Sequence, residues 1–418
     1  MTSLIGSDET IFVGLDIGTS KICMLVGHMD PEGHIRVIGL GLVPSAGMRK
    51  GGVVSLEALA KAIGTAKDKA ERTSGYEITS ALVSLSGTQI SSMNSKGMAG
   101  VAGRTIGFDD VARALEAARS VAVPYNREIV HVIPRGFVVD GQDGIKSALG
   151  MHGYRLEVEA HIVTDSATAL RNLEKCIEAS GISVDSWVLS SLAAGETVLT
   201  ETEREMGVVV CDIGGGTCDL AVYIEGSVWH TAVIPVGGDH LTNDIAQGLH
   251  LPAESAESVK RRHGLASQAM VDGDQAFAVR PFGQGEAVHI KQADLAAIVE
   301  PRVEELFGLV RQEIKRSGYD GLLPAGVVLT GGSSQVPGIR QVASEVLRLP
   351  VRQAGPEDLR GLVDQLHSPA FSASTGLLRW GRLQDEEIMM DGRGSGSLGL
   401  AKFDIARAAD FLKRLLPG

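Results

Sequence analysis

The sequence predicts an α/β protein with two similar sheet-based lobes, an α+β subdomain inserted into the first lobe, and an amphipathic helix at the C-terminus. Its 418 residues exceed the size at which a single core usually stops growing. Segments 12–27 and 208–223 share one pattern: an apolar run, an aspartate, a turn of small residues and a second apolar run. Because the copies lie half a chain apart, they indicate a duplication at the scale of a domain.

Composition and charge indicate that the body of the protein is cytosolic. Hydrophobic residues make up 44% and charged residues 22%, and the net charge of −12 argues against a dedicated nucleic-acid binder. The four cysteines form no CxxC pair, so neither a disulfide framework nor a zinc site is expected. The N-terminus lacks a secretory-signal pattern, and no window reaches the ~18 apolar residues of a membrane span.

The first half alternates strand and helix signals. A buried hairpin at 12–27 is followed by a strand at 34–43 and by a helix at 56–75 that ends on a glycine. Residues 81–165 are predicted to form the inserted subdomain, with strands at 81–87, 128–140 and 154–164 and a helix at 109–122. A helix at 166–181 then resumes the first lobe, which we assign to residues 1–80 and 166–206.

The second half repeats this organisation. The predicted elements are a hairpin at 208–223, strand–turn–helix units at 229–249 and 327–347, and helices at 253–264 and 293–316. We assign residues 207–383 to the second lobe, including a nucleotide- and partner-binding subdomain at about 239–320. The polar, glycine-rich stretch 384–399 is expected to be a flexible linker, and 400–418 the amphipathic helix.

The turns of the two hairpins predict a phosphate site. Small residues let backbone N–H groups approach an anion closely, and successive amides form a concave donor surface. Hydroxyl groups add further donors and Lys21 adds a positive charge. The predicted phosphate-binding residues are Gly18, Thr19, Ser20, Lys21, Gly214, Gly215, Gly216 and Thr217.

Asp16 and Asp212 occupy the same position in the two hairpins. A carboxylate beside a phosphate is repulsive unless a cation lies between them, so both residues are predicted to hold Mg²⁺, through water. The alternative is a pair of tight hairpins with ordinary turn aspartates. That explanation suits one hairpin better than two matching ones.

Other glycine motifs are less specific. No G-x-x-x-x-G-K-[ST] motif is present, which excludes a P-loop enzyme. The pattern at Gly394, Gly396 and Gly399 follows a polar linker rather than a strand, so it is not a dinucleotide fingerprint. The pairs Gly237–Gly238 and 331–332 lie between a strand and a helix, where a base or ribose can lie against bare backbone.

The motifs VGLDIGTSK, VVVCDIGGGTCDLAVY and VLTGGSSQVPGI resemble the phosphate-one, phosphate-two and adenosine motifs of the actin and sugar-kinase superfamily. Within it the chain resembles the FtsA family of bacterial cell-division proteins over nearly its whole length, including NSKG, GMHGYRLEVEAHIVT, LTETERE and ESVKRRHG. The resemblance implies two RNase H-like lobes around ATP–Mg²⁺ and an FtsA-type inserted subdomain.

The resemblance also implies site residues and partners. Glu257 and Lys260 would approach the ribose and base, and Gly331, Gly332 and Ser333 would line the adenine pocket. The family binds the tubulin-like protein FtsZ, self-assembles as actin does and attaches to the membrane by its C-terminus. Arg302 is a candidate contact for the acidic FtsZ tail; local ion pairs on its helix are the alternative.

The C-terminal segment predicts a membrane-surface helix. On a helical wheel an apolar half, interrupted by Asp404, faces a half that carries four basic residues with Asp410. Such a helix on a flexible linker suits insertion into an anionic membrane surface, although it could also dock on its own domain. The resemblance implies that this surface is the inner face of the cytoplasmic membrane at midcell. The predicted membrane-binding residues are Ile405, Phe411, Leu412, Lys413, Arg414, Leu415 and Leu416.

Catalysis is less clearly indicated than binding. ATP hydrolysis needs a group that positions the attacking water, and the segment SSLAAGETVL offers only Glu196, for which a surface position on a helix is the alternative. We therefore expect at most slow hydrolysis, with no catalytic residue assigned. A small-molecule kinase of the sugar-kinase branch and a pilus-assembly actin homologue remain alternatives; the first lacks a convincing acceptor-site aspartate, and the amphipathic tail counts against the second.

Overall fold

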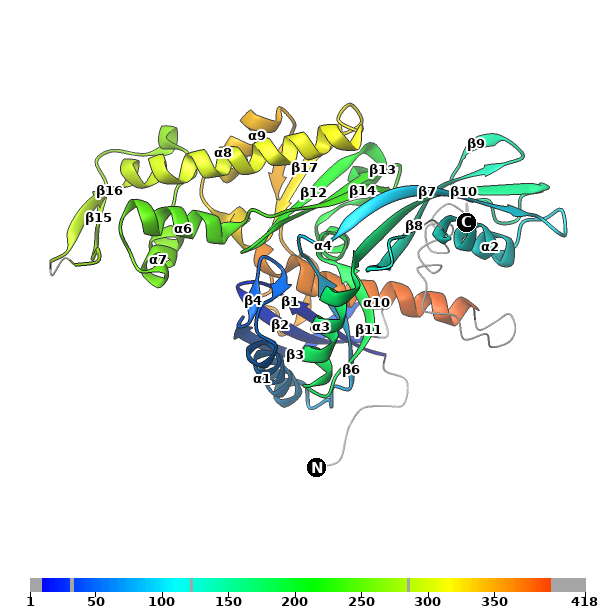
Figure 1. Cartoon of the computed structure of the whole chain (residues 1–418), viewed down its shortest axis with the longest axis horizontal. Helices are drawn as coiled ribbons and strands as arrows, with labels where there is room; N and C mark the ends of the chain where they lie inside the picture. The colour runs from blue at the N-terminus through cyan, green and yellow to red at the C-terminus, as the bar shows by residue number, and fades with distance from the viewer. Residues whose placement is uncertain (1–9, 31–33, 121–122, 284–285, 392–418) are drawn as a thin grey trace.

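The computed structural model describes residues 10–30, 34–120, 123–283 and 286–391, and the structural statements below concern these residues. The two-lobed α/β fold is confirmed, with one large sheet in each lobe. Figure 1 shows an elongated molecule in which the inserted subdomain lies at one end of the second sheet and helices α6 and α7 lie at the other. The predicted membrane-binding residues 405–416 lie outside the described residues.

The first sheet has six strands in the order β11-β6-β1-β2-β3-β19. The bounds are β1 (Ile11–Ile17), β2 (Lys21–Met29), β3 (Ile35–Pro44), β6 (Ser80–Leu85), β11 (Ser183–Leu189) and β19 (Arg360–Gly361). β1 and β2 are antiparallel, as the predicted hairpin requires, and β6 runs parallel to β1. Helices α1 (Leu56–Ser74) and α3 (Ala167–Glu178) pack their apolar stripes on this sheet, through Leu59, Ile63, Leu170 and Leu173.

The second sheet repeats the design with five strands in the order β14-β13-β12-β17-β18. The bounds are β12 (Val208–Ile213), β13 (Cys218–Ile224), β14 (Ser227–Ile234), β17 (Gly326–Thr330) and β18 (Val351–Gln353). Again the hairpin β12–β13 is antiparallel, and β12 runs parallel to the next strand, β17. Its helices are α6 (Gly238–Gly248), α7 (Ala253–His263), α8 (Gln292–Ser317) and α9 (Ile339–Leu347), which bury one large apolar cluster with the sheet.

Two helices join the lobes. α4 (Ser190–Val198) and α10 (Ser372–Asp391) share one core with strands of both sheets, including Leu82, Leu192, Val210, Leu377 and Trp380. The helices approach very closely at Gly376, where an added Cβ would lie 1.8 Å from the Ala193 carbonyl oxygen. The short helix α5 (Glu201–Met206) follows α4 and begins with a capping box from Thr200 and Glu203.

The inserted subdomain has its own sheet, in the order β7-β10-β8-β9. Its elements are β7 (Ser91–Gly100), α2 (Phe108–Arg119), β8 (Arg127–Val139), β9 (Gln142–Ile145) and β10 (Arg155–Ser166). α2 packs directly on β7, because Gly97 leaves room for the backbone of Ala114. Smaller pairs are β4 (Met48–Arg49) with β5 (Gly52–Val53) and β15 (Ala276–Val279) with β16 (Val288–Lys291).

Three predicted boundaries are wrong. β6 pairs with β1 and β11, so the strand expected to open the insertion at 81 belongs to the first sheet. The end of the predicted second lobe returns to the first: β19 pairs with β3, and Leu378 of α10 packs with Phe12 and Leu25. Residues 384–391, predicted as the start of the flexible linker, are instead the end of α10.

All four cysteines are buried free thiols. No helix among the described residues is sufficiently long and apolar to cross a bilayer.

Candidate nucleotide site

The two predicted phosphate turns have the same backbone geometry. In the first hairpin the Gly18 N–H donates to the Lys21 carbonyl at 3.0 Å, and in the second the Gly214 N–H donates to the Thr217 carbonyl at 2.9 Å. The turns therefore match in hydrogen bonding as well as in sequence. This geometry agrees with a duplicated hairpin.

The structure brings these turns together, although they belong to different sheets. A Cβ on Gly216 would lie 2.7 Å from Thr19 Oγ1, and a Cβ on Gly215 would lie 3.4 Å from the Ser20 Cβ. All eight predicted phosphate-binding residues therefore lie in two opposed turns. Lys21 is directed elsewhere, since its ammonium donates to the Ala370 carbonyl at 2.5 Å and lies 5.1 Å from the centre of the Phe371 ring.

Asp16 lies at the end of β1, buried and held by hydroxyl groups from two other elements. Ser84 of β6 donates to its carboxylate at 2.7 Å, and Ser374 of α10 donates at 2.6 Å. The Ser84 oxygen also accepts the Ile17 N–H at 3.0 Å. These bonds fix the carboxylate in place.

Asp212 faces a second acid across its hairpin. It pairs in register with Asp219, and both carboxylates are buried. Burial, with the charges of Asp219 and Asp16, raises the pKa of Asp212 to about 8. Burial also raises the pKa of Asp219 to about 6, although hydrogen bonds from Ser86 and Thr217 oppose that rise.

This acidic cluster has the chemistry of a divalent-cation site. Among the described residues, none donates a hydrogen bond to the Asp212 carboxylate, and Asp219 Oδ1 is buried without a partner. Within the described ranges, no group of three or more His, Cys, Asp or Glu side chains is placed to hold a metal ion by itself. Mg²⁺ in nucleotide sites typically takes one or two carboxylates together with waters and phosphate oxygens, so Asp16 and Asp212 fit such an ion.

The predicted nucleoside residues cluster against the second turn. The Gly214 carbonyl accepts the Gly238 N–H at 3.0 Å and the Ser333 hydroxyl at 2.9 Å. Lys260 is buried, donates to the Gly238 carbonyl at 3.0 Å and pairs with Glu257 at 2.6 Å. Gly237 caps α6, so the N-terminus of this 11-residue helix lies beside the second turn.

The Gly331–Gly332 turn does not lead directly into the α-helix that the sequence predicts. A 3₁₀ turn, η2 (Gly332–Gln335), follows it, and α9 begins only at Ile339. Gly331 has φ +85°, and a Cβ there would lie 2.3 Å from Asp212 Oδ1. This glycine therefore allows the backbone to pass directly over the acidic cluster.

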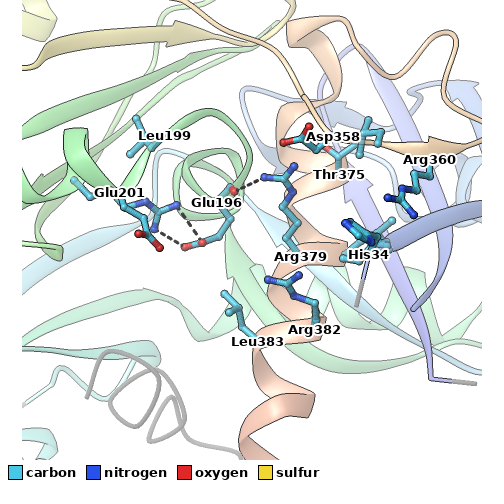
Figure 2. A pocket seen from close by; sticks show the side chains of 14 residues that line it. His34, Glu196, Leu199, Glu201, Asp358, Arg360, Thr375, Arg379, Arg382 and Leu383 are labelled. Carbon is cyan, nitrogen blue, oxygen red and sulfur yellow. Dashed lines mark hydrogen bonds and ion pairs between the residues drawn. The ribbon is translucent and has the colours of Figure 1, made fainter. Parts of the chain in front are cut away.

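Glu196 does not lie at this site, and the expectation of a surface glutamate is also wrong. Its carboxylate is largely buried and pairs with the Arg204 guanidinium at 3.0 Å. It lines a separate pocket with residues of α10 and β3, none of which comes from a hairpin turn (Figure 2). Glu196 therefore does not occupy the position of a carboxylate that could orient the attacking water.

Arg302 lies on α8, within ion-pair distance of two acids. Its guanidinium contacts Asp244 of α6 through two bonds, of 2.6 and 3.0 Å, and also pairs with Glu305. These are the local ion pairs named as the alternative to partner binding. The partner role of Arg302 stays a prediction.

Sequence reasoning missed Asp219, Ser84, Ser86 and Ser374. A signal existed for Asp219 alone: aligning the hairpins places it opposite Asp212, whereas Cys23 takes that place opposite Asp16. The serines come from β6, its following loop and α10, and only the tertiary structure brings them to the acids.

Comparisons with known proteins identify the family. A profile described as Cell division protein FtsA matches residues 209–376, and one described as SHS2 domain inserted in FTSA matches residues 87–164. Cell division protein FtsA of Pseudomonas aeruginosa is 41% identical over 408 residues, which cover 98% of each chain. The chain belongs to the FtsA family of cell-division proteins. The FtsA proteins of Escherichia coli (39% identity, 90% of this chain and 91% of that protein) and Bacillus subtilis (38%, 91% and 87%) agree.

Solved structures of distant proteins share the actin-like fold with this FtsA-family chain. The PilM–PilN type IV pilus biogenesis complex matches with a TM-score of 0.64 at 17% identity, covering 89% of this chain and 98% of that one. MreB5 of Spiroplasma citri bound to ADP matches with a TM-score of 0.56 at 14% identity, covering 90% and 98%. At these identities the likeness shows the fold alone. The FtsA relatives therefore outweigh both the pilus-homologue and the small-molecule-kinase alternatives.

Proposed function

We propose that this chain binds ATP–Mg²⁺ between its lobes, assembles into actin-like polymers, and tethers FtsZ filaments to the inner face of the cytoplasmic membrane at midcell. The observation that carries the proposal is the convergence of two matching turns, from different sheets, beside a buried acidic cluster. Turns of this kind bind phosphate through backbone amides, and a divalent cation offsets the repulsion between acids and phosphate.

The nucleotide would act mainly as a structural ligand. Asp16 and Asp212 would hold the Mg²⁺, which offsets phosphate charge when it is bound. The turn residues would bind phosphate, while Gly238, Lys260 and Ser333 would border the nucleoside. Because Glu196 is paired elsewhere with Arg204, we expect slow or conditional hydrolysis.

Membrane attachment would use residues 400–418. Their apolar half would insert among lipid chains, and Lys413 and Arg414 would each contribute about 1 kcal/mol at an acidic surface. The FtsZ C-terminal peptide would bind the subdomain that contains α8, with Arg302 exchanging an internal acid for an acidic residue of the peptide. Other division proteins are further partners.

Co-sedimentation of the full chain with phosphatidylglycerol-containing liposomes tests the tether, with and without ATP–Mg²⁺ and an FtsZ C-terminal peptide. Deletion of 400–418 is expected to abolish sedimentation while leaving binding of a fluorescent ATP analogue unchanged. A matched variant, Leu412→Gln with Leu416→Gln, keeps the chain length and charge and should reproduce the loss. Undiminished lipid binding by the truncated chain would contradict the membrane role, and no ATP binding by the full chain would contradict the nucleotide role.

Fluorescence anisotropy with the labelled FtsZ peptide tests the partner site separately. We expect Arg302→Ala to weaken binding about tenfold, the size of one charge-assisted contact. Arg311→Ala on the same helix is the control, because Arg311 donates to the Val346 carbonyl and forms no ion pair among the described residues. Equal effects of the two substitutions would remove Arg302 from the site.

A further inference from the structure

A pocket of about 760 Å³ lies beside α10, apart from the nucleotide site (Figure 2). Its lining comes from the start of β3, from α4 and α5, from residues 358–360 and from α10. Ile35, Leu378 and Leu383 contribute buried apolar side chains. The volume is within the range of about 300–1,000 Å³ that is typical of small-molecule sites.

Charged side chains make up most of the polar lining of this pocket. Four arginines line it, at positions 204, 360, 379 and 382, against three acids, at positions 196, 201 and 358. Arg204 pairs with Glu196 at 3.0 Å, and Arg360 pairs with Asp30, outside the pocket, at 3.0 Å. Figure 2 shows Arg379 and Arg382 one helical turn apart on α10, on the same side of the pocket.

Arg379 is held by neutral groups. Its guanidinium donates to the Glu196 carbonyl at 3.1 Å and to the Glu357 carbonyl at 2.7 Å. In the part of the chain that the structure describes, it has no carboxylate within 4.0 Å. Burial lowers the pKa of Arg379, and the positive charges of Arg382 and Arg204 add to that effect, against Asp358 and Glu196.

A guanidinium in this position is preorganised for an anion. The two carbonyls fix its plane, and a guanidinium has five N–H donors, so donors remain for a planar or tetrahedral oxyanion. Bound anions satisfy such donors with short, charge-assisted hydrogen bonds. The acids and arginines of the lining nearly balance, so an anion would be held by the donors of Arg379 rather than by a basic field.

We propose that this pocket binds a small organic anion, with carboxylate or phosphate groups on Arg379 and an apolar body on the side chains of Ile35, Leu378 and Leu383. The ligand would span α4, α10 and the 358–360 segment. It would therefore tie together the two helices that join the lobes. This site is independent of the nucleotide site and of the tether.

Isothermal titration of the full chain, saturated with ATP–Mg²⁺ to occupy the nucleotide site, tests the proposal. The probes are phthalate, with two carboxylates on an apolar ring, and phenyl phosphate; their comparison separates carboxylate from phosphate ligands. At least one is expected to bind with a Kd of about 1 mM or lower. Arg379→Gln should weaken that binding about ten- to a hundredfold. Arg379→Lys should weaken it less, because lysine keeps the positive charge but lacks the planar, multidentate donors of a guanidinium.

Arg311→Gln is the matched control, since it removes an arginine bonded to a backbone carbonyl outside the pocket. Binding by this variant should equal that of the unmodified chain. If Arg379→Gln does not fold, as judged by circular dichroism, Arg379→Lys provides the test, because it keeps the charge and should still weaken binding. The proposal would be overturned if neither probe bound the unmodified chain at a probe concentration of about 20 mM, which is 20-fold above the expected Kd. Equal binding by the Arg379 and Arg311 variants would also overturn it.

Discussion

Burial disfavours the ionised form of Asp212, and the neighbouring charges of Asp219 and Asp16 add to this effect. Because the folded pKa of Asp212 is raised to about 8, the folded state retains a proton that the unfolded state loses near pH 4. The contribution of this residue to stability is therefore complete below about pH 4. It is lost as the pH rises towards 8.

Asp212→Asn tests this effect together with the proposed metal role. Without nucleotide, the variant should be more stable than the unmodified chain at pH 8, by about 1–3 kcal/mol, because the buried charge is removed. ATP–Mg²⁺ binding should weaken about tenfold or more. Urea unfolding at pH 5.5, 7 and 8 and titration with a fluorescent ATP analogue measure the two effects. Asp143→Asn, at an exposed position, is the control; an unchanged pH dependence in Asp212→Asn would contradict the prediction.

His161 predicts the opposite response to acid. It lies between the inserted sheet and β14, with Nδ1 2.8 Å from Asn94 Oδ1 and Nε2 2.9 Å from Thr231 Oγ1. Burial, with the nearby His230, lowers its pKa to about 3. The unfolded histidine takes up a proton near pH 6.5, so the stability that it supports is lost as the pH falls from about 6.5 towards 3.

His161→Gln should therefore flatten the acid dependence of unfolding, by up to about 1.4 kcal/mol per pH unit below pH 6. At pH 7 it should cost about 1–3 kcal/mol through its lost hydrogen bonds. Thermal or urea unfolding between pH 4 and 7 measures both. His289→Gln, on an exposed strand position, should change neither, and an equal slope in the two variants would contradict the assignment.

Among the elements, α4 and α10 depend on a helix crossing that only glycine permits. A Cβ at Gly376 would lie 1.8 Å from the Ala193 carbonyl oxygen, which backbone movement alone can relieve. Gly376→Ala is therefore expected to destabilise the chain by about 2–4 kcal/mol, in the range of overpacked cores. Denaturant unfolding measures this.

Gly308→Ala in α8 is the matched comparison. No atom lies within 4 Å of its Cβ position, so the substitution should stabilise the helix by about 0.5–1 kcal/mol through helix propensity. The same substitution thus has opposite signs in two helices. A stabilising Gly376→Ala would show that the crossing is looser than described.

At the scale of the whole molecule, the proposed nucleotide site is built from turns of both lobes. A side chain at Gly216 would meet Thr19 Oγ1 at 2.7 Å and Lys50 Cα at 2.9 Å, and would therefore separate the turns. Gly216→Val should weaken binding of a fluorescent ATP analogue at least tenfold while circular dichroism stays unchanged. Gly100→Val, with no atom within 4 Å of its Cβ position, is the control. Normal binding by Gly216→Val would place the nucleotide elsewhere.

Local patterns account for what the sequence predicted correctly. The hairpins, their glycine turns and helices such as α1 and α3 follow from periodicity and turn chemistry within about 20 residues. The duplication of the turn motif indicated that distant segments come together, and Gly216 of the second turn does lie beside Thr19 of the first. FtsA membership also follows from sequence, over 98% of the chain.

Long-range packing decided the rest. The sequence by itself determined the two hairpins, the positions of Asp16 and Asp212 in them, and the family, because each depends on a contiguous motif. Only the tertiary structure decided that β6 joins the first sheet, that α10 returns to it, and that Glu196 is committed to Arg204. The physical reason is that burial and charge pairing depend on neighbours distant in sequence: Ser374 reaches Asp16 across 358 residues, and no local pattern records that contact.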